Sequence, residues 1–390
     1  MIKLLLDREK LFCCTFFIWC LYFSLFITTN YANKLEGNLQ YIVVSWTIFV
    51  LVVKELASLR EIMAYSLIRF SIMCIFLLLS IKVMGNSYGL IFLSSMLLVV
   101  SARDVNFSKI LLTFILAVLT LFGLTIGGNK VGIVKSLYSI QDGRFRDSLG
   151  FSYVSFPSQY AFFLTAAYIA LRKREISYLE LVLLTGLDIY IYQNSHTTSP
   201  FVLAMFLIIY VTITKILKTD IIVKFSLTRV LATLTFLIAP TILWWLCFKA
   251  PTALFVMADK FVNNRLRLSV SGLQTFGVTL FGQKVNFITL DSVGRFSSNY
   301  NYIDSSYFQN LVVNGLLFTA MILVLFTYVS YKSVRYQNDT LTVVLIALSL
   351  HAMFDPQMIV LWYSPFGMLL GKLFSGDDTD FIVKNQMTKL

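Results

Sequence analysis

Long apolar runs alternate with short polar segments along almost the whole chain. An apolar run of about 18 or more residues is long enough to cross the hydrocarbon core of a bilayer as a helix. The pattern predicts twelve membrane-spanning helices, several of them short. The first is interpreted as a span and not as a signal peptide, because its apolar run is long and no small-residue cleavage site follows. The expected spans are 11–28, 39–53, 66–81, 88–102, 110–126, 157–171, 178–192, 201–216, 230–247, 311–330, 341–354 and 359–374.

The distribution of Lys and Arg predicts the orientation of these spans. With the N-terminus inside, the inner segments carry nineteen basic residues, whereas the short outer loops carry only Lys34 and Lys82. Short cytoplasmic loops are enriched in Lys and Arg. We therefore expect an all-α, multi-pass protein of the cell (cytoplasmic) membrane, a single transmembrane domain over 1–390 with both termini cytoplasmic.

Two long segments interrupt the apolar pattern, at 127–156 and 248–310. Both fall on the outer side in this topology, so the outer face is expected to be the working face. The second is the only segment of more than fifty residues that could not sit in a bilayer, and it is dense in Gly, Asn, Ser and Tyr.

The composition supports the membrane assignment. The chain is 58% hydrophobic and 13% charged, with a mean hydropathy of +0.78, which is outside the range of soluble proteins. Its net charge of +12 arises from loops that flank the membrane, so nucleic-acid binding is not expected. The five Cys fall within expected spans and show neither disulfide nor metal-site spacing.

Each long outer segment contains a pair of arginines, Arg144 with Arg146 and Arg265 with Arg267. Arg295 belongs to the same candidate set. Arginine presents a planar fork that matches phosphate oxygens, so two such loops facing one another would hold a diphosphate. Contact with lipid headgroups, or simple solvation, is an equally good interpretation of loop arginines at a membrane surface.

Local geometry decides how many arginines of the second pair reach one ligand. Residues two apart share a face on a strand but diverge by about 200° on a helix. Asn264 is a candidate cap for a helix, in which case only one arginine would face a ligand. The alternating sequence after it equally permits a short strand.

Other polar residues gather at the outward ends of the expected spans, namely Asp188, His196, His351 with Asp355, and Asp304 with Tyr307. An acid inside a span is a functional candidate, but near an interface Asp188 can simply be hydrated. His351 is more readily an interfacial residue, and His196 a loop residue. No HExxH, P-loop, GxSxG or paired-acid motif occurs in the outer segments, so neither a metal nor a cofactor is expected.

At these loops the chain resembles Wzy-type polysaccharide polymerases, of the O-antigen polymerase/ligase superfamily. The similarity lies in NNRLRLSVSGLQTFGVTLFGQKV, in IDSSYFQNLVVNGLLF and in RDSLGFSYVSFP. The matching positions are Arg265-Leu266, Phe281-Gly282-Gln283, Asp304-Ser305-Ser306-Tyr307, and Arg146 with Ser148, Leu149, Gly150 and Phe151. The chain departs from the family at Ser199-Pro200, where Ser-Arg is usual. Related ligases tend to have His where Asp304 stands, which favours a polymerase.

The resemblance implies a GT-C-like, metal-independent glycosyltransferase that polymerises polyprenyl-diphosphate-linked oligosaccharides into a surface polysaccharide on the outer face. In that scheme Arg265 and Arg146 stabilise the diphosphate, and Asp304 is the general base, with His196 and His351 behind it. Support is expected from Tyr307, Ser148 and Asp188. The expected partners are the lipid-linked oligosaccharide, membrane lipid, a chain-length regulator and a flippase.

Two alternatives remain. A ligase-type transferase would attach finished polymer to another acceptor. A lipid-linked oligosaccharide flippase or other transporter is the second, although the spans contain few ionisable residues of the kind that line a translocation path.

Overall fold

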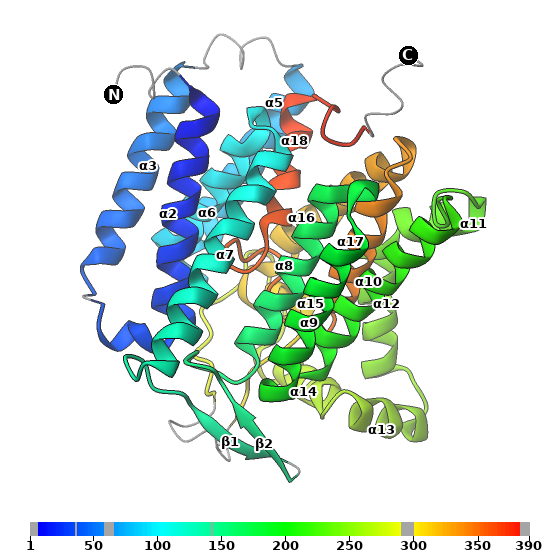
Figure 1. Ribbon diagram of the computed structural model, residues 1–390. Coiled ribbons are helices and arrows are strands. Elements are labelled where there is room, and N and C mark those ends of the chain that lie inside the picture. Colours follow the sequence, from blue (N-terminus) through cyan, green and yellow to red (C-terminus); the bar gives the residue numbers. More distant parts are fainter. Residues whose placement is uncertain (1–6, 36, 58–65, 142, 290–299, 383–390) are drawn as a thin grey trace. The chain divides into compact units, whose positions relative to one another are not determined.

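The structure, a computed structural model, describes residues 7–35, 37–57, 66–141, 143–289 and 300–382 (Figure 1). It is 73% helical. Within the described residues, six helices are long and apolar enough to cross a membrane: Arg8–Thr28, Leu39–Ala57, Leu67–Asn86, Phe107–Lys130, Thr198–Leu217 and Gly315–Arg335. A seventh candidate is a pair of helices bent by 72°, Ser226–Thr233 and Thr235–Phe248. The chain is thus a mainly helical membrane protein, as its apolar runs predict.

The expected span 178–192 corresponds to α9 (Tyr178–Ser195) of 18 residues, and the other remaining spans correspond to shorter elements. Helices α6 (Leu90–Ser101), α8 (Phe156–Arg172) and α17 (Asp339–His351) contain 12, 17 and 13 residues. The expected span 359–374 is not one helix but a series of turns followed by η5 (Pro365–Met368) and α18 (Leu369–Ser375). Pro365 explains the break, because proline has no amide donor and disfavours a helical residue before it. The number of twelve spans stays a prediction.

The described residues form two compact units, and the first is drawn from Met1–Ser66, Leu97–Thr219 and Ile359–Asp380. Helix α8 is its centre and packs against α7, α9 and α10, while α2 packs against α3 and α7. The sequence of α8 suits this position, because most of its residues are buried and small Ala side chains permit close approach. Besides α8, η5 and α18, the elements of this unit are α2 (Arg8–Thr28), η1 (Asn30–Asn33), α3 (Leu39–Ala57), η3 (Ala102–Asp104), α7 (Phe107–Lys130), β1 (Tyr138–Gln141), β2 (Arg144–Asp147), η4 (Lys173–Glu175), α9 (Tyr178–Ser195) and α10 (Thr198–Leu217).

Aromatic residues of the C-terminal segment complete the core of the first unit. The ring of Trp362 lies 6.0 Å from that of Trp19, and Tyr363 stacks on Tyr160 at 4.6 Å. Ser24 donates a hydrogen bond of 3.3 Å to the Trp362 carbonyl oxygen. The turns around Trp362 are therefore buried among helices.

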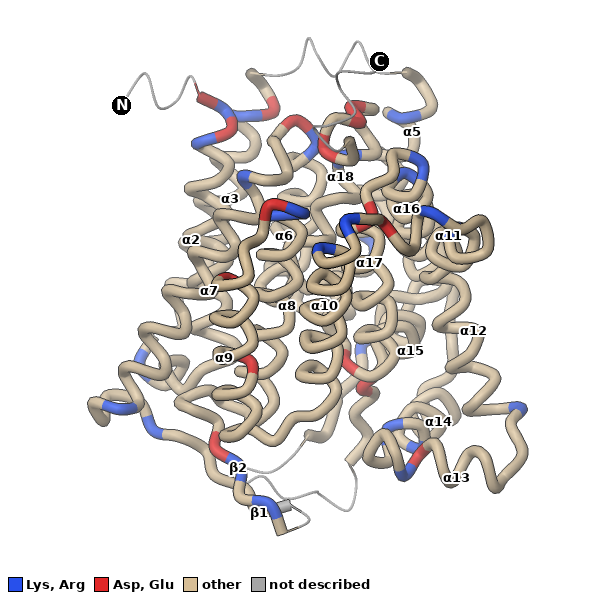
Figure 2. Tube along the Cα trace, turned by 45° about the vertical axis from the view of Figure 1, so that its right-hand side comes forward, with Lys and Arg blue, Asp and Glu red and all other residues tan. Residues whose placement is uncertain are grey.

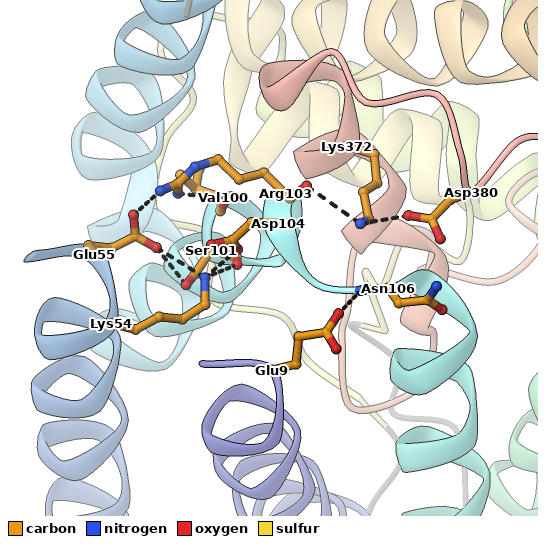
Figure 3. A network of polar contacts seen from close by, with 10 residues as sticks. All are labelled: Glu9, Lys54, Glu55, Val100, Ser101, Arg103, Asp104, Asn106, Lys372 and Asp380. Carbon is orange, nitrogen blue, oxygen red and sulfur yellow. Dashed lines mark hydrogen bonds and ion pairs between the residues drawn. The ribbon is translucent and has the colours of Figure 1, made fainter. Parts of the chain in front are cut away.

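A network of charged residues closes one end of the first unit (Figure 3). Lys54, whose side chain is fully buried, pairs with Asp104 and donates 2.7 Å to the Ser101 carbonyl oxygen. Two further ion pairs, Arg103 with Glu55 and Lys372 with Asp380, join the same cluster. In each unit the charged residues gather at helix ends and in connections (Figure 2), so this network ties α3, η3 and α18 together where their apolar stretches end.

The second unit is drawn from Leu67–Met96, Asp220–Met358 and Phe381–Leu390, and α6 contains residues of both units. Its central helix is α16, which contacts α5, α11, α12, α15 and α17. Aromatic contacts fill the interfaces. The ring centroids of Phe318 and Phe92 lie 5.6 Å apart, and Phe326 stacks on Phe236 with a centroid distance of 4.7 Å. Besides α17, its elements are α5 (Leu67–Val83), η2 (Met84–Asn86), α11 (Ser226–Thr233), α12 (Thr235–Phe248), α13 (Thr252–Phe261), α14 (Arg265–Phe276), α15 (Ser306–Val313) and α16 (Gly315–Arg335).

Candidate functional site

The arginine pair of the second long outer segment lies on a helix. Helix α14 begins at Arg265, directly after Asn263 and Asn264, which have φ of 55° and 64°. Asparagine tolerates this left-handed conformation better than most residues, so the two Asn form the turn between α13 and α14. The helical alternative is therefore confirmed. Asn264 occupies the expected N-cap position, but its side chain makes no capping hydrogen bond.

The two arginines of α14 point to different partners. The Arg265 guanidinium donates through Nη1 to the Phe354 carbonyl oxygen, and the same nitrogen lies 3.2 Å from Asp355 Oδ2. Arg267 instead lies 3.4 Å from Asp259 Oδ2. The Arg265 side chain is 19% exposed and that of Arg267 is 67% exposed. Their divergence follows from the helical period, and it leaves Arg265 as the arginine of an organised site.

Asp355 lies between Arg265 and His351. Helix α17 ends at His351, and the Asp355 backbone N–H donates 3.0 Å to the His351 carbonyl oxygen. The Asp355 carboxylate is 2% exposed, and its Oδ2 lies 3.6 Å from His351 Nε2. A buried carboxylate is stable only beside compensating charge and hydrogen bonds. The ion pair with Arg265 supplies the compensating charge, and the His351 imidazole lies beside the same oxygen atom.

Asp304 belongs to the same electrostatic group. It is half-buried, in the segment just before α15. Burial raises its pKa from the usual 3.8 to about 6; the positive charge of Arg265 opposes the rise, and the negative charge of Asp355 adds to it. Near neutral pH the carboxylate is thus ionised but holds a proton more readily than an exposed aspartate does.

The residues after Asp304 attach it to α17 and to the turn beyond. The Ser306 hydroxyl donates 2.6 Å to the Asp355 carbonyl oxygen and accepts a bond of 3.1 Å from the Met358 backbone N–H. The Tyr307 hydroxyl donates 2.9 Å to the Ser349 carbonyl oxygen. Both side chains are buried. In the Asp-Ser-Ser-Tyr sequence, therefore, Ser306 and Tyr307 hold the segment in place while Asp304 carries the titratable group.

The Phe281-Gly282-Gln283 sequence forms a clip over the start of α16. The backbone N–H groups of Leu316 and Leu317 donate to the carbonyl oxygens of Thr279 and Leu280. Two glycines make this contact possible. Both have positive φ, 74° at Gly282 and 84° at Gly315, and a Cβ on Gly282 would lie 1.9 Å from the Val313 carbonyl oxygen. This sequence thus positions α15 and α16 and adds no ionisable group to the site.

The arginines of the first long outer segment lie on a β-hairpin of the first unit. Strand β1 pairs antiparallel with β2, which carries Arg144 and Arg146. Arg144 is exposed. Arg146 donates 2.7 Å through Nε to the Ser195 carbonyl oxygen and 3.0 Å through Nη2 to Thr197 Oγ1. Arg146 thus joins the hairpin to the end of α9 and the start of α10. The hairpin was not predicted from the sequence.

The other candidates of the first unit are also held within the protein. Ser148 is buried and exchanges backbone and side-chain hydrogen bonds of 2.8–3.0 Å with Leu137. Asp188, on α9, is buried and accepts 2.9 Å from the Thr165 hydroxyl. His196 ends α9 in a left-handed conformation with φ 46°. These contacts give Ser148 and His196 structural positions at the hairpin and at the α9 terminus.

The site in the second unit thus consists of four residues: Arg265, Asp304, His351 and Asp355. The first three were sequence candidates. Asp355 was noted only as the end of an expected span, although its spacing of four from His351 on a helical pattern would have placed both on one side. The candidate Arg295 lies outside the described residues.

The site combines a fixed cation, a carboxylate of raised pKa and a buried carboxylate that orients its neighbours. Such a group can stabilise an anionic ligand and accept a proton close by. Among the residues that the structure describes, no three His, Cys, Asp or Glu side chains are grouped so as to hold a metal ion. Comparisons of the chain with protein-family models, with curated proteins and with solved structures found no match.

Proposed function

We propose that this protein is a membrane glycosyltransferase that polymerises polyprenyl-diphosphate-linked oligosaccharide repeat units into a surface polysaccharide. In this proposal both termini are cytoplasmic, and the site at Arg265 faces the outer side of the cell membrane. The prenyl tail of the substrate remains among the spans, and the sugars meet beyond the outer ends of the helices.

The observation that carries the proposal is the position of Arg265. Its guanidinium is oriented by the buried Asp355, and its electrostatic neighbour Asp304 has a pKa of about 6. A diphosphate leaving group develops negative charge that a fixed guanidinium stabilises. An acceptor hydroxyl must lose a proton, and Asp304 is ionised and able to accept it at neutral pH. A glycosyl transfer from a lipid diphosphate needs both of these properties.

The proposed step balances as a simple displacement. The acceptor hydroxyl oxygen of one repeat unit attacks the anomeric carbon of the growing glycan, and the bond from that carbon to the diphosphate oxygen breaks. The proton of the hydroxyl passes to Asp304, and the polyprenyl diphosphate leaves with the bonding electron pair beside Arg265. The cationic charge is that of arginine, so the proposed enzyme is metal-independent.

Arg146 also has a proposed role, in the binding of substrate. Two of its guanidinium nitrogens are engaged by Ser195 and Thr197, which holds the planar group in one orientation. We assign it to a contact of the first unit with a lipid-linked repeat unit. The proposed partners are a flippase that delivers repeat units and a protein that regulates chain length.

A chain-length assay tests the function and separates its alternatives. Membranes from cells without the protein are examined for lipid-linked repeats and for polymer. Loss of polymer with single repeats displayed outside supports the polymerase. Single repeats trapped inside would identify a flippase, and undiminished free polymer with none attached would identify a ligase; either outcome overturns the proposal.

A further inference from the structure

Helix α13 presents a stripe of apolar side chains with no cover. Ala253, Val256, Met257, Lys260 and Phe261 are exposed, and they follow the spacing of one helical face. The exposed fractions are 51% for Val256, 65% for Met257 and 88% for Phe261. In a soluble protein an exposed apolar stripe promotes aggregation or marks an interaction site. The question is therefore what covers this stripe.

The preceding helix indicates what these surroundings are. Helix α12 is apolar and ends at Phe248, only three residues before α13 begins at Thr252. Near its end Trp244 and Trp245 are 46% and 43% exposed, and the Lys249 ammonium lies 5.9 Å from the Trp244 ring centroid. Exposed tryptophans beside a lysine are typical of the interface between acyl chains and headgroups. Helix α13 therefore starts at the depth of that interface.

The direction and charge of α13 fit a helix that lies along this surface. Figure 1 shows α13 running across the end of α12 instead of extending it. Lys260 stands among the exposed apolar residues, and Lys249 precedes the helix. A helix with an apolar face and basic residues binds in the plane of the interface and is attracted to anionic headgroups.

We propose that α13 is an interfacial helix, with Val256, Met257 and Phe261 inserted between the lipids of one leaflet. The occupant of the stripe is the bilayer itself, because the exposed surface of α12 leads directly into it.

The buried face of α13 connects this immersion to α14. Asp259 is 1% exposed, and its Oδ1 accepts 3.0 Å from the Arg267 backbone N–H. Its carbonyl oxygen accepts 2.8 Å from the Asn264 backbone N–H. These bonds fix the first turn of α14 against α13. Immersion of α13 therefore sets the height of Arg265 at the headgroup level, where a lipid-linked diphosphate lies. This consequence rests on the proposed function; the immersion does not.

Fluorescence quenching of the full-length protein tests the immersion. The chain has five Trp, so Met257→Trp and Phe261→Trp are each compared with the parent in vesicles of phosphatidylethanolamine and phosphatidylglycerol. Lys284→Trp, at an exposed position of the segment after α14, is the aqueous control. We expect the added fluorescence at 257 and 261 to be quenched by acyl-brominated lipids and spared by iodide, with the reverse at 284.

Two results would overturn the immersion. Quenching of positions 257 and 261 by iodide and not by brominated lipid would place the stripe in water. Protection from both quenchers would show that protein covers it. The link to Arg265 is tested separately with Phe261→Asp, which we expect to reduce polymer formation at unchanged protein level. If the quenching result holds but this variant makes normal polymer, immersion stands and the link to the site fails.

Discussion

The Arg265 guanidinium lies 3.2 Å from Asp355 Oδ2, and the Asp355 side chain is 2% exposed. This pair joins the first turn of α14 to the turn that follows α17. The same carboxylate oxygen lies 3.6 Å from His351 Nε2, so one buried carboxylate lies beside a guanidinium and an imidazole. Asp355 is thereby a positioning residue of the proposed site, and its removal is the most direct test of the arrangement.

Asp355→Asn keeps the size of the side chain but removes the charge that orients Arg265. A displacement of about 1 Å in a catalytic group lowers rates by about 10²-fold, and we expect a loss of polymer formation of that order. The readout is the rate at which purified protein extends lipid-linked repeat units. Asp7→Asn is the control, because it changes an acid that pairs with the exposed Lys10 at the protein surface and lies outside the site. Equal losses in both variants would contradict a special role for Asp355.

Arg265→Lys keeps the positive charge but loses the planar fork. A lysine cannot donate to the Phe354 carbonyl oxygen and to a diphosphate in the same geometry, so we expect a decrease of about 10²-fold in polymerisation rate. Arg267→Lys is the control from the same helix, because the Arg267 side chain is 67% exposed and points away from Asp355. Full activity of Arg265→Lys would remove this residue from the site.

The pH dependence of the reaction tests Asp304 as the base. Its pKa is raised to about 6, and only the ionised carboxylate can accept a proton. The rate should therefore fall about tenfold per pH unit below about 6 and become flat above it. In Asp304→Asn the rate should be low and this inflection absent. A variant that retains both the rate and the inflection would remove Asp304 as the base.

The clip over α16 makes a prediction about folding. In Gly282→Ala the new Cβ would meet the Val313 carbonyl oxygen at 1.9 Å, on a backbone with φ 74°. Overpacking of this kind costs about 1–3 kcal/mol, before the strain of the left-handed backbone is added. Chemical denaturation in detergent should show that loss. Gly186→Ala is the control, because its Cβ meets nothing within 4 Å and alanine favours a helix. Equal stability of the two variants would contradict the clip.

Local pattern predicts those parts of the fold that are apolar throughout. Helix α7 occupies Phe107–Lys130 where a span at 110–126 was expected, and its sequence has no internal break. The segment 359–374 is equally apolar, yet Pro365 and burial of its turns among helices decide its structure. A hydropathy pattern shows that a segment is apolar, but it does not show whether the segment is one helix or a series of turns packed among helices.

The same distinction applies to the site. Arg265, Asp304 and His351 were candidates because of their residue types and their places at the outward ends of the pattern. The ion pair of Arg265 with Asp355 joins segments that are distant in the sequence, so no local pattern predicts it. The resemblance to polymerases pointed to Tyr307 as a support residue, and the structure shows its hydroxyl bound to the Ser349 carbonyl oxygen.

The buried ion pair of the first unit makes the last prediction. Lys54→Met leaves the Asp104 carboxylate beside the fully buried position of a lost cation. Removing one partner of a buried pair costs about 3–5 kcal/mol, so the free energy of unfolding in detergent should fall by that order. Lys109→Met is the matched control, because Lys109 is 57% exposed and pairs with Glu9 at the surface, where a pair contributes about 0–1 kcal/mol. The double change of Lys54→Met with Asp104→Leu should recover much of the loss, because an apolar pair of similar volume leaves no charge uncompensated. If instead the double variant is less stable than Lys54→Met alone, the remaining bonds of Asp104 contribute more than its pairing with Lys54.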